Sequence, residues 1–132
     1  MGSWDRTKGV VSANIKQSVV KREREINSLE KMQDIVKKNS ALIVDVRSKD
    51  IFLKGHIPNA RSIPLSKFDD LIGDFYKTWQ LDQKMVVYCS SPECTDSHTF
   101  ATKLFKMGYE NVLVFPGGFN GWKKEGLKIE KD

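Results

Sequence analysis

Cys89 is the residue in this sequence best placed to do chemistry, because its thiol follows an apolar run and opens a loop. The run Met85-Val86-Val87-Tyr88 is mostly β-branched and aromatic, a composition typical of a buried parallel strand. The loop that follows, from Ser90 to Ser97, is rich in small and turn-forming residues. The pattern therefore predicts a thiol at the carboxyl end of a central strand.

A helix is predicted directly after this loop, where Asp96 or Ser97 can cap its first turn. Its apolar positions recur at the spacing of one helix face: Phe100, Ala101, Leu104 and Phe105. The first N–H groups and the positive end of the helix dipole then face the loop interior. Because a helix N-terminus lowers the pKa of a free thiol from roughly 8.5, we expect a nucleophilic thiolate at Cys89. In the alternative interpretation, Cys89 is an apolar residue that finishes a core strand.

A second apolar strand is predicted over residues 41–47, and it ends in charged residues. Asp45 and Arg47 are costly to bury unless they are paired, so we expect them to be tied to neighbouring loops as structural support. A catalytic carboxylate is the alternative role for Asp45. His56 stands between Gly55 and Pro58, in a sequence typical of a tight turn. We therefore expect His56 to fasten that turn through hydrogen bonds and not to act as a general base.

The remaining strand signals complete an alternating pattern of helices and strands. Residues 111–115 form a further apolar strand, and Gly117-Gly118 after it allow backbone to approach the cysteine loop closely. Trp122 on the next short helix is large enough to cover a core edge. The alternation predicts an α/β domain with a parallel sheet and helices on both faces, whose site lies at the carboxyl ends of the strands.

Length and charge indicate a single domain with a basic N-terminal segment. The chain has 132 residues and a net charge of +5, and residues 1–40 carry nine Lys/Arg against five Asp/Glu. The rest is nearly neutral, which argues against a nucleic-acid surface. We expect a flexible basic arm over residues 1–23, with a partner-binding helix as the alternative. The folded domain is predicted over residues 24–128, followed by a C-terminal tail over residues 129–132.

The joint spacing of several short motifs resembles a single-domain rhodanese over about Ile26 to Leu127. The motifs are Ile43-Val44-Asp45-Val46-Arg47, Gly55-His56-Ile57-Pro58-Asn59-Ala60, Ile63-Pro64, Val86-Val87-Tyr88-Cys89, Gly108-Tyr109-Glu110-Asn111-Val112 and Gly117-Gly118 with Trp122. The resemblance implies a five-stranded parallel sheet with helices on both faces. It also implies a sulfurtransferase that passes sulfane sulfur through a persulfide on Cys89, the nucleophile by motif match.

The loop departs from many rhodaneses in charge and length. It carries Glu93 and Asp96 and has no Lys or Arg, so we expect a polysulfide or small persulfide to be favoured over the thiosulfate dianion as donor. The loop residues expected to bind substrate are Ser90, Ser91, Pro92, Glu93, Cys94, Thr95, Asp96 and Ser97. The loop also resembles the longer loops of phosphatase and arsenate-reductase relatives. Without a nearby phosphate-binding Arg, however, that chemistry is not supported.

Cys94 has two open interpretations. It could attack a persulfide or disulfide on Cys89, which would release sulfur or protect the site from over-oxidation. Alternatively, Cys94 is a small apolar residue that packs in the loop. Cys89, Cys94 and His98 have a spacing that a metal could use, but these three ligands match no known zinc spacing, and we expect neither a metal nor another cofactor.

The sequence therefore predicts a rhodanese-type sulfurtransferase. Its expected partners are a sulfur donor and a thiol or cyanide acceptor, and no nucleic acid is expected. A partner protein that docks on the basic arm is left open. The competing hypothesis is a non-enzymatic module that carries sulfur or docks a partner. No apolar run approaches a membrane span, and no signal-peptide core is seen. We expect a cytoplasmic protein, or a periplasmic one if an upstream signal was removed.

Overall fold

The structure is a computed structural model that describes residues 24–132. Its strands are β1 (Leu42–Asp45), β2 (Arg61–Ser62), β3 (Met85–Tyr88) and β4 (Val112–Phe115). Its helices are α2 (Leu29–Lys38), α3 (Lys49–Lys54), α4 (Phe68–Thr78), α5 (Asp96–Lys106) and α6 (Gly118–Lys124), with a 3-10 turn, η1, at Leu65–Lys67. The expected arm over residues 1–23 lies outside the described residues.

The strands form one parallel sheet in the order β2-β1-β3-β4, which places β3 inside the sheet. The prediction of five strands is wrong for the described residues, because the structure has four. Ahead of α2, Glu25 makes a single parallel bridge to Val114. The Ile26 N–H donates to the Val114 carbonyl at 2.7 Å, and the Val114 N–H donates to the Arg24 carbonyl at 2.7 Å. The pairing stops there because Ser28 already caps α2, whose first residue is Leu29.

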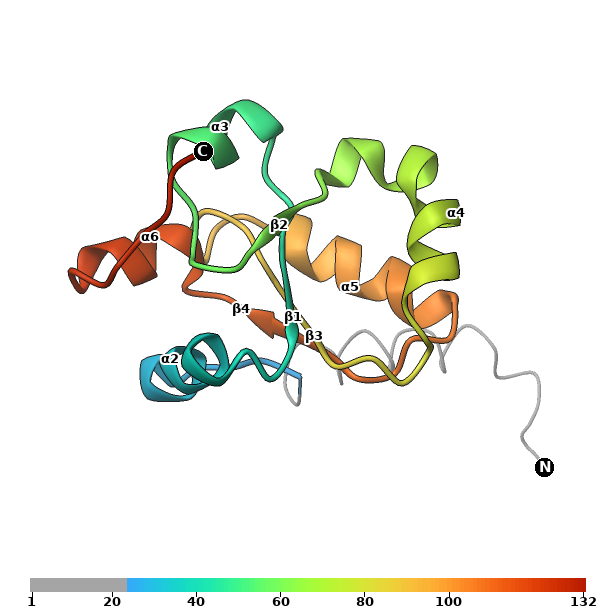
Figure 1. Cartoon of the computed structure of the whole chain (residues 1–132), viewed down its shortest axis with the longest axis horizontal. Coiled ribbons are helices and arrows are strands. Elements are labelled where there is room, and N and C mark those ends of the chain that lie inside the picture. Colours follow the sequence, from blue (N-terminus) through green and yellow to red (C-terminus); the bar gives the residue numbers. More distant parts are fainter. Residues whose placement is uncertain (1–23) are drawn as a thin grey trace.

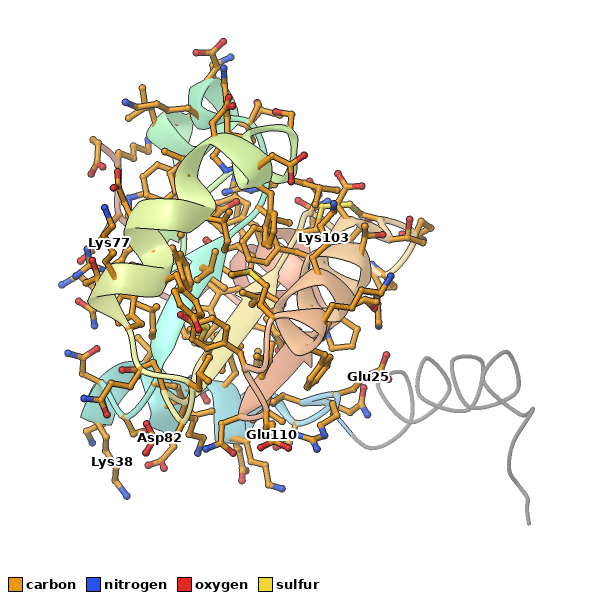
Figure 2. The ribbon with its side chains drawn as sticks, turned by 90° about the vertical axis from the view of Figure 1, so that its right-hand side faces the viewer. Glu25, Lys38, Lys77, Asp82, Lys103 and Glu110 are labelled. Atoms are coloured by element: carbon orange, nitrogen blue, oxygen red, sulfur yellow. A yellow bond between two sulfur atoms is a disulfide. The ribbon has the colours of Figure 1, made fainter. Side chains whose placement is uncertain are left out.

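The two faces of the sheet are covered by different helices, as Figure 1 shows. Alternate residues of each strand point to opposite faces. Val44, Val87 and Val114 pack with residues of α4 and α5 on one face. On the other face, residues of α2 and α6 pack against a second set: Ile43, Val86, Tyr88 and Phe115. In Figure 2, α4 and α5 lie side by side in front of the sheet. The prediction of an α/β fold with a parallel sheet is confirmed.

The last residues of the chain contact the turn around His56. His56 and Glu130 form an antiparallel bridge, with N–H to carbonyl distances of 2.8 and 2.9 Å. The Glu130 carboxylate also accepts the Asn59 N–H at 3.0 Å. Within the expected C-terminal tail, residues 129–132, Glu130 therefore holds the turn at His56 and Asn59.

Candidate active site

Cys89 follows β3 directly, between the ends of β1 and β4. Strand β3 ends at Tyr88, which pairs with Asp45 of β1 and Phe115 of β4, so the cysteine emerges at the carboxyl edge of the sheet. Cys89 is only 4% exposed. Its backbone is therefore held by the sheet while its side chain enters the loop that leads to α5.

The loop turns back on itself and brings Cys94 onto Cys89. The Cys94 N–H donates to the Ser91 carbonyl at 3.0 Å, which closes a tight turn. The two cysteines form a disulfide with their Cα atoms 6.3 Å apart. Since the chain has two cysteines, neither thiol is free in this state. Cys94 is half-buried and packs against the core that includes Cys89. Its bond to Cys89 is compatible with the interpretation as a reacting thiol, and its packing is compatible with the interpretation as a small apolar residue.

Helix α5 begins at Asp96, which is earlier than a cap at Asp96 or Ser97 would allow. Thr95 occupies the N-cap position, and Asp96 is the first helical residue, so neither Asp96 nor Ser97 is the cap. One carboxylate oxygen of Asp96 lies within 4.8 Å of both cysteine sulfurs. The positive end of the α5 dipole and a negative carboxylate therefore act on the same two sulfur atoms.

The other side chains of the predicted loop differ in their burial. Ser97 is buried and 2% exposed, Ser90, Ser91 and Cys94 are half-buried, and the remaining members are exposed: Pro92, Glu93, Thr95 and Asp96. The Ser91 hydroxyl donates to the exposed Glu93 carboxylate and holds the pKa of that group below its usual value. Of the two loop carboxylates, Asp96 is thus the one that the structure brings to the sulfurs.

Helix α6 anchors the start of the loop through its first N–H groups. Phe119 N–H donates to the Cys89 carbonyl at 2.9 Å, and Asn120 N–H donates to the Ser90 carbonyl at 2.8 Å. Gly118, with φ of +63°, makes this approach possible, since a Cβ there would lie 2.6 Å from the Cys89 carbonyl oxygen. The close approach predicted for the glycine pair is present at Gly118.

Asp45 and Arg47 form a buried ion pair beside the site. Arg47 Nε and Nη2 donate to the Asp45 carboxylate, with the shortest distance at 2.6 Å, and Nη2 also donates to the Gly55 carbonyl at 2.8 Å. The guanidinium carbon lies 4.4 Å from the centre of the Phe119 ring. Arg47 therefore links β1, the turn at Gly55 and α6, and its donors toward Asp45 and Gly55 are engaged.

Tyr88 makes a buried hydrogen bond that the sequence analysis missed, because Tyr88 was interpreted only as an apolar strand residue. Its buried hydroxyl accepts the Ile57 N–H at 3.1 Å. Burial and the neighbouring Asp45 carboxylate raise the pKa of the Tyr88 phenol well above its ordinary value. Tyr88 thus stays neutral and joins β3 to the turn that contains His56.

His56 lies in that turn, and its ring stacks on Phe52 with centroids 3.9 Å apart. Its Nδ1 lies 2.9 Å from the Ile57 carbonyl, an acceptor that requires a proton on Nδ1, and its Nε2 lies 3.4 Å from Asp132. The hydrogen-bond and stacking partners of the His56 ring are thus Ile57, Asp132 and Phe52, and neither cysteine is among them. The structure groups His56 with Asp45, Arg47 and Tyr88 instead of with the sulfurs.

A hollow of about 390 Å³ opens beside the loop, between α3 and α6. Ser90, Phe119 and Asn120 line its inner side. Its cationic lining residues are Arg47, Lys54, Lys123 and Lys131. Positive charge that is missing from the loop itself is therefore present next to Ser90.

The metal-ligand set considered from spacing does not come together. His98 lies with its Nε2 2.7 Å from Glu25, at the edge where residues 24–26 meet the domain (Figure 2), while Asp96 takes the place beside the sulfurs. Cys89, Cys94 and Asp96 would offer three donors when reduced, but the disulfide withholds both thiolates.

Residues 28–125 match the rhodanese-like domain family, and the chain belongs to that family. It is 29% identical over 101 residues to a protein of Actinobacillus succinogenes named thiosulfate sulfurtransferase GlpE, a match that covers 76% of this chain and 86% of the relative. It is 30% identical over 105 residues to a sulfurtransferase of Allochromatium vinosum, covering 80% and 92% of the two chains.

A solved structure of similar fold is the BH2092 protein of Bacillus halodurans. It superposes with a TM-score of 0.74 at 25% identity, over 91% of this chain and 86% of that chain. The family match and the names of the relatives confirm the predicted class, a rhodanese-type sulfurtransferase. Among the described residues, no helix is long and apolar enough to cross a membrane.

Proposed function

We propose that this chain moves sulfane sulfur through a persulfide on Cys89, and that polysulfide or a small persulfide is favoured over thiosulfate as donor. The observation that supports the proposal is the position of the Cys89 sulfur, at the carboxyl end of β3 and the start of α5 in a rhodanese-like domain. Once the disulfide is reduced, the Cys89 thiolate attacks the sulfane sulfur of the donor. The added sulfur then passes to a thiol, cyanide or protein acceptor.

The loop from Ser90 to Ser97 would hold the persulfide mainly through backbone N–H groups. The first N–H groups of a helix have no partner within it, and those of α5 begin at this loop. The loop has no cationic side chain, and the neighbouring Arg47 is engaged by Asp45 and Gly55. The donor is therefore held without a direct counter-charge from the loop.

Asp96 supports the preference against thiosulfate. A compact dianion at the Asp96-to-sulfur distance, within 4.8 Å, is destabilised by about 1.7 kcal/mol even at the dielectric constant of water. A long polysulfide can keep its distant charge in solvent. We therefore expect transfer from polysulfide to be at least about tenfold more efficient than from thiosulfate, a difference of about 1.4 kcal/mol in transition-state binding.

The role of Cys89 is tested by intact mass spectrometry of the reduced chain after exposure to polysulfide, thiosulfate or a small-thiol persulfide. In Cys94→Ser, whose one remaining thiol is Cys89, sulfur mass should appear on Cys89 and disappear after a cyanide wash. Cys89→Ser should lose transfer while remaining folded. A Cys89→Ser variant that still turned over would exclude Cys89 as the nucleophile.

The donor preference is tested by comparing transfer efficiencies in matched variants. Asp96→Asn should narrow the gap in transfer efficiency between thiosulfate and polysulfide. Glu93→Gln should change that gap little, because Glu93 is not part of the cluster at the two sulfurs. Lys123→Gln shows whether the basic hollow beside Ser90 contributes to anion binding. Equal use of both donors by the unmodified chain would contradict the preference, and a further loss of thiosulfate use in Lys123→Gln would identify the hollow as the compensating charge.

A further inference from the structure

The disulfide between Cys89 and Cys94 points to a second half-reaction at this site. We infer that Cys94 is a resolving thiol that reduces the Cys89 persulfide, releases sulfide and leaves the disulfide seen in the structure. This inference rests on the proposed persulfide at Cys89. It extends that function from sulfur transfer to the reduction of sulfane sulfur, with a dithiol as the reductant.

The loop geometry brings the resolving thiol to the correct sulfur. Cys89 is fixed by β3 and by the Phe119 N–H bond to its carbonyl, so the approach must come from Cys94. The turn closed by the Cys94 N–H and the Ser91 carbonyl makes that approach and sets the Cα atoms 6.3 Å apart, a normal separation for a disulfide. The sulfur of Cys89 is thus within reach of Cys94 without refolding of the loop.

The step balances in atoms and electrons. The Cys94 thiolate attacks the Cys89 sulfur, a new S–S bond forms between the cysteines, and the bond to the outer sulfur breaks. The outer sulfur leaves with the electron pair as hydrosulfide, so it is reduced while the two cysteine thiols are oxidised. The proton of the Cys94 thiol passes to water or to Asp96, whose carboxylate oxygen lies within 4.8 Å of both sulfurs, and from there to the sulfide.

The difference in exposure between the two cysteines determines how the disulfide is reset. Cys94 is half-buried, whereas Cys89 is 4% exposed, so an external dithiol reaches the Cys94 sulfur first. Attack there breaks the bond between the two cysteine sulfurs and releases Cys89 as the leaving thiolate. The second thiol of the reductant then frees Cys94. Each cycle converts one sulfane sulfur and one dithiol into sulfide and an oxidised dithiol.

The experiment is a single turnover of the full chain without added thiol. The protein is reduced, freed of reductant and mixed with one equivalent of a small-thiol persulfide, and sulfide and intact mass are followed. The unmodified chain should release nearly one sulfide per chain and end as the Cys89–Cys94 disulfide. Cys94→Ser should keep one added sulfur on Cys89 and release at least about tenfold less sulfide. Cys94→Ala is the second variant, in case the serine perturbs the loop.

The outcomes separate this inference from the proposed function. If the unmodified chain keeps its persulfide while Cys94 stays open to alkylation, the inference is wrong and the proposed function stands. If Cys94→Ser releases sulfide as fast as the unmodified chain, Cys94 is not the resolving thiol. If neither Cys94 variant acquires sulfur on Cys89, the proposed persulfide itself fails, and with it the inference.

Discussion

The contact between Gly118 and the Cys89 carbonyl gives the sharpest test of how the thiol is positioned. In Gly118→Ala, the added Cβ would lie 2.6 Å from the Cys89 oxygen and 2.8 Å from the Ser90 carbonyl carbon. Both are backbone atoms, so neither can rotate away, and either α6 or the loop must shift. The substitution therefore disturbs the close approach through which the Phe119 and Asn120 N–H groups hold the start of the loop.

The expected cost has two parts. An alanine at φ of +63° loses roughly 1–2 kcal/mol in backbone conformation, and the forced shift adds about 1–3 kcal/mol as in an overpacked core. A displaced Cys89 should also load sulfur more slowly, by up to about a hundredfold for a misplacement near 1 Å. Urea unfolding measures the first effect, and the rate of sulfur loading in intact mass spectra measures the second.

Two other glycines serve as matched controls. Gly126 has a similar φ of +72° but open space around its Cβ position, so Gly126→Ala should show only the conformational cost. Gly121 lies within α6 with open space, so Gly121→Ala should be neutral or stabilising by up to about 1 kcal/mol. If Gly118→Ala is no less stable than Gly126→Ala and loads sulfur at the unmodified rate, the contact does not position the thiol.

Three further predictions follow from buried or neighbouring charges. Folding raises the pKa of Tyr88, so its contribution to stability is complete below the unfolded pKa near 10 and is lost as pH rises toward the folded pKa. In that pH window the free energy of unfolding should fall by about 1.4 kcal/mol per pH unit. Tyr88→Phe should lack this slope. Arg47→Met leaves the Asp45 carboxylate buried without its partner, and urea unfolding should show a loss of about 3–5 kcal/mol. Asp96→Asn in the reduced chain should speed alkylation of Cys89 by iodoacetamide about threefold at neutral pH, since one charge at that distance is worth roughly 0.9 kcal/mol in water.

Each of these predictions has a matched comparison. Tyr109, whose pKa is also raised by burial, remains in Tyr88→Phe, so the difference in slope between the two proteins isolates Tyr88. The double change Asp45→Asn with Arg47→Met should recover much of the lost stability, and no recovery would mean that the pair acts through packing. Glu93→Gln should leave the alkylation rate unchanged, because Glu93 is exposed and is not part of the cluster at the sulfurs.

The sequence was sufficient for features that depend on local pattern. The apolar run before Cys89 predicted the strand, and its end predicted the edge where the thiol emerges. The glycine pair predicted the close approach of backbone to the loop, because few other residue types permit it. Asp45 and Arg47 were interpreted as structural support tied to neighbouring loops, from the cost of burying charge alone. In the structure they pair with each other at 2.6 Å, and Arg47 also donates to the Gly55 carbonyl.

The features that failed or stayed open depend on contacts between distant or loop atoms. The number of strands was wrong because residues 24–26 continue into the cap of α2 after a single bridge. The relation of Cys94 to Cys89 depends on the turn at Ser91, which no periodicity indicates. Asp96 or Ser97 was expected to cap α5, but Thr95 takes that position. Asp96 was also expected to act on the donor as a loop carboxylate, and its oxygen lies within 4.8 Å of both sulfurs.

The two charges at the sulfurs bear on which sulfur species this site retains. The N-terminus of α5 stabilises an anionic thiolate or persulfide by about 0.3–1 kcal/mol, and Asp96 opposes it by roughly 0.9 kcal/mol in water. These terms nearly cancel, which weakens the sequence-based expectation of a strongly lowered thiol pKa at Cys89. A disulfide between Cys89 and Cys94 carries no charge, so neither the helix dipole nor the Asp96 carboxylate changes its stability in this way. The local electrostatics therefore add little to the retention of a persulfide anion on Cys89, which is compatible with a resolving role for Cys94.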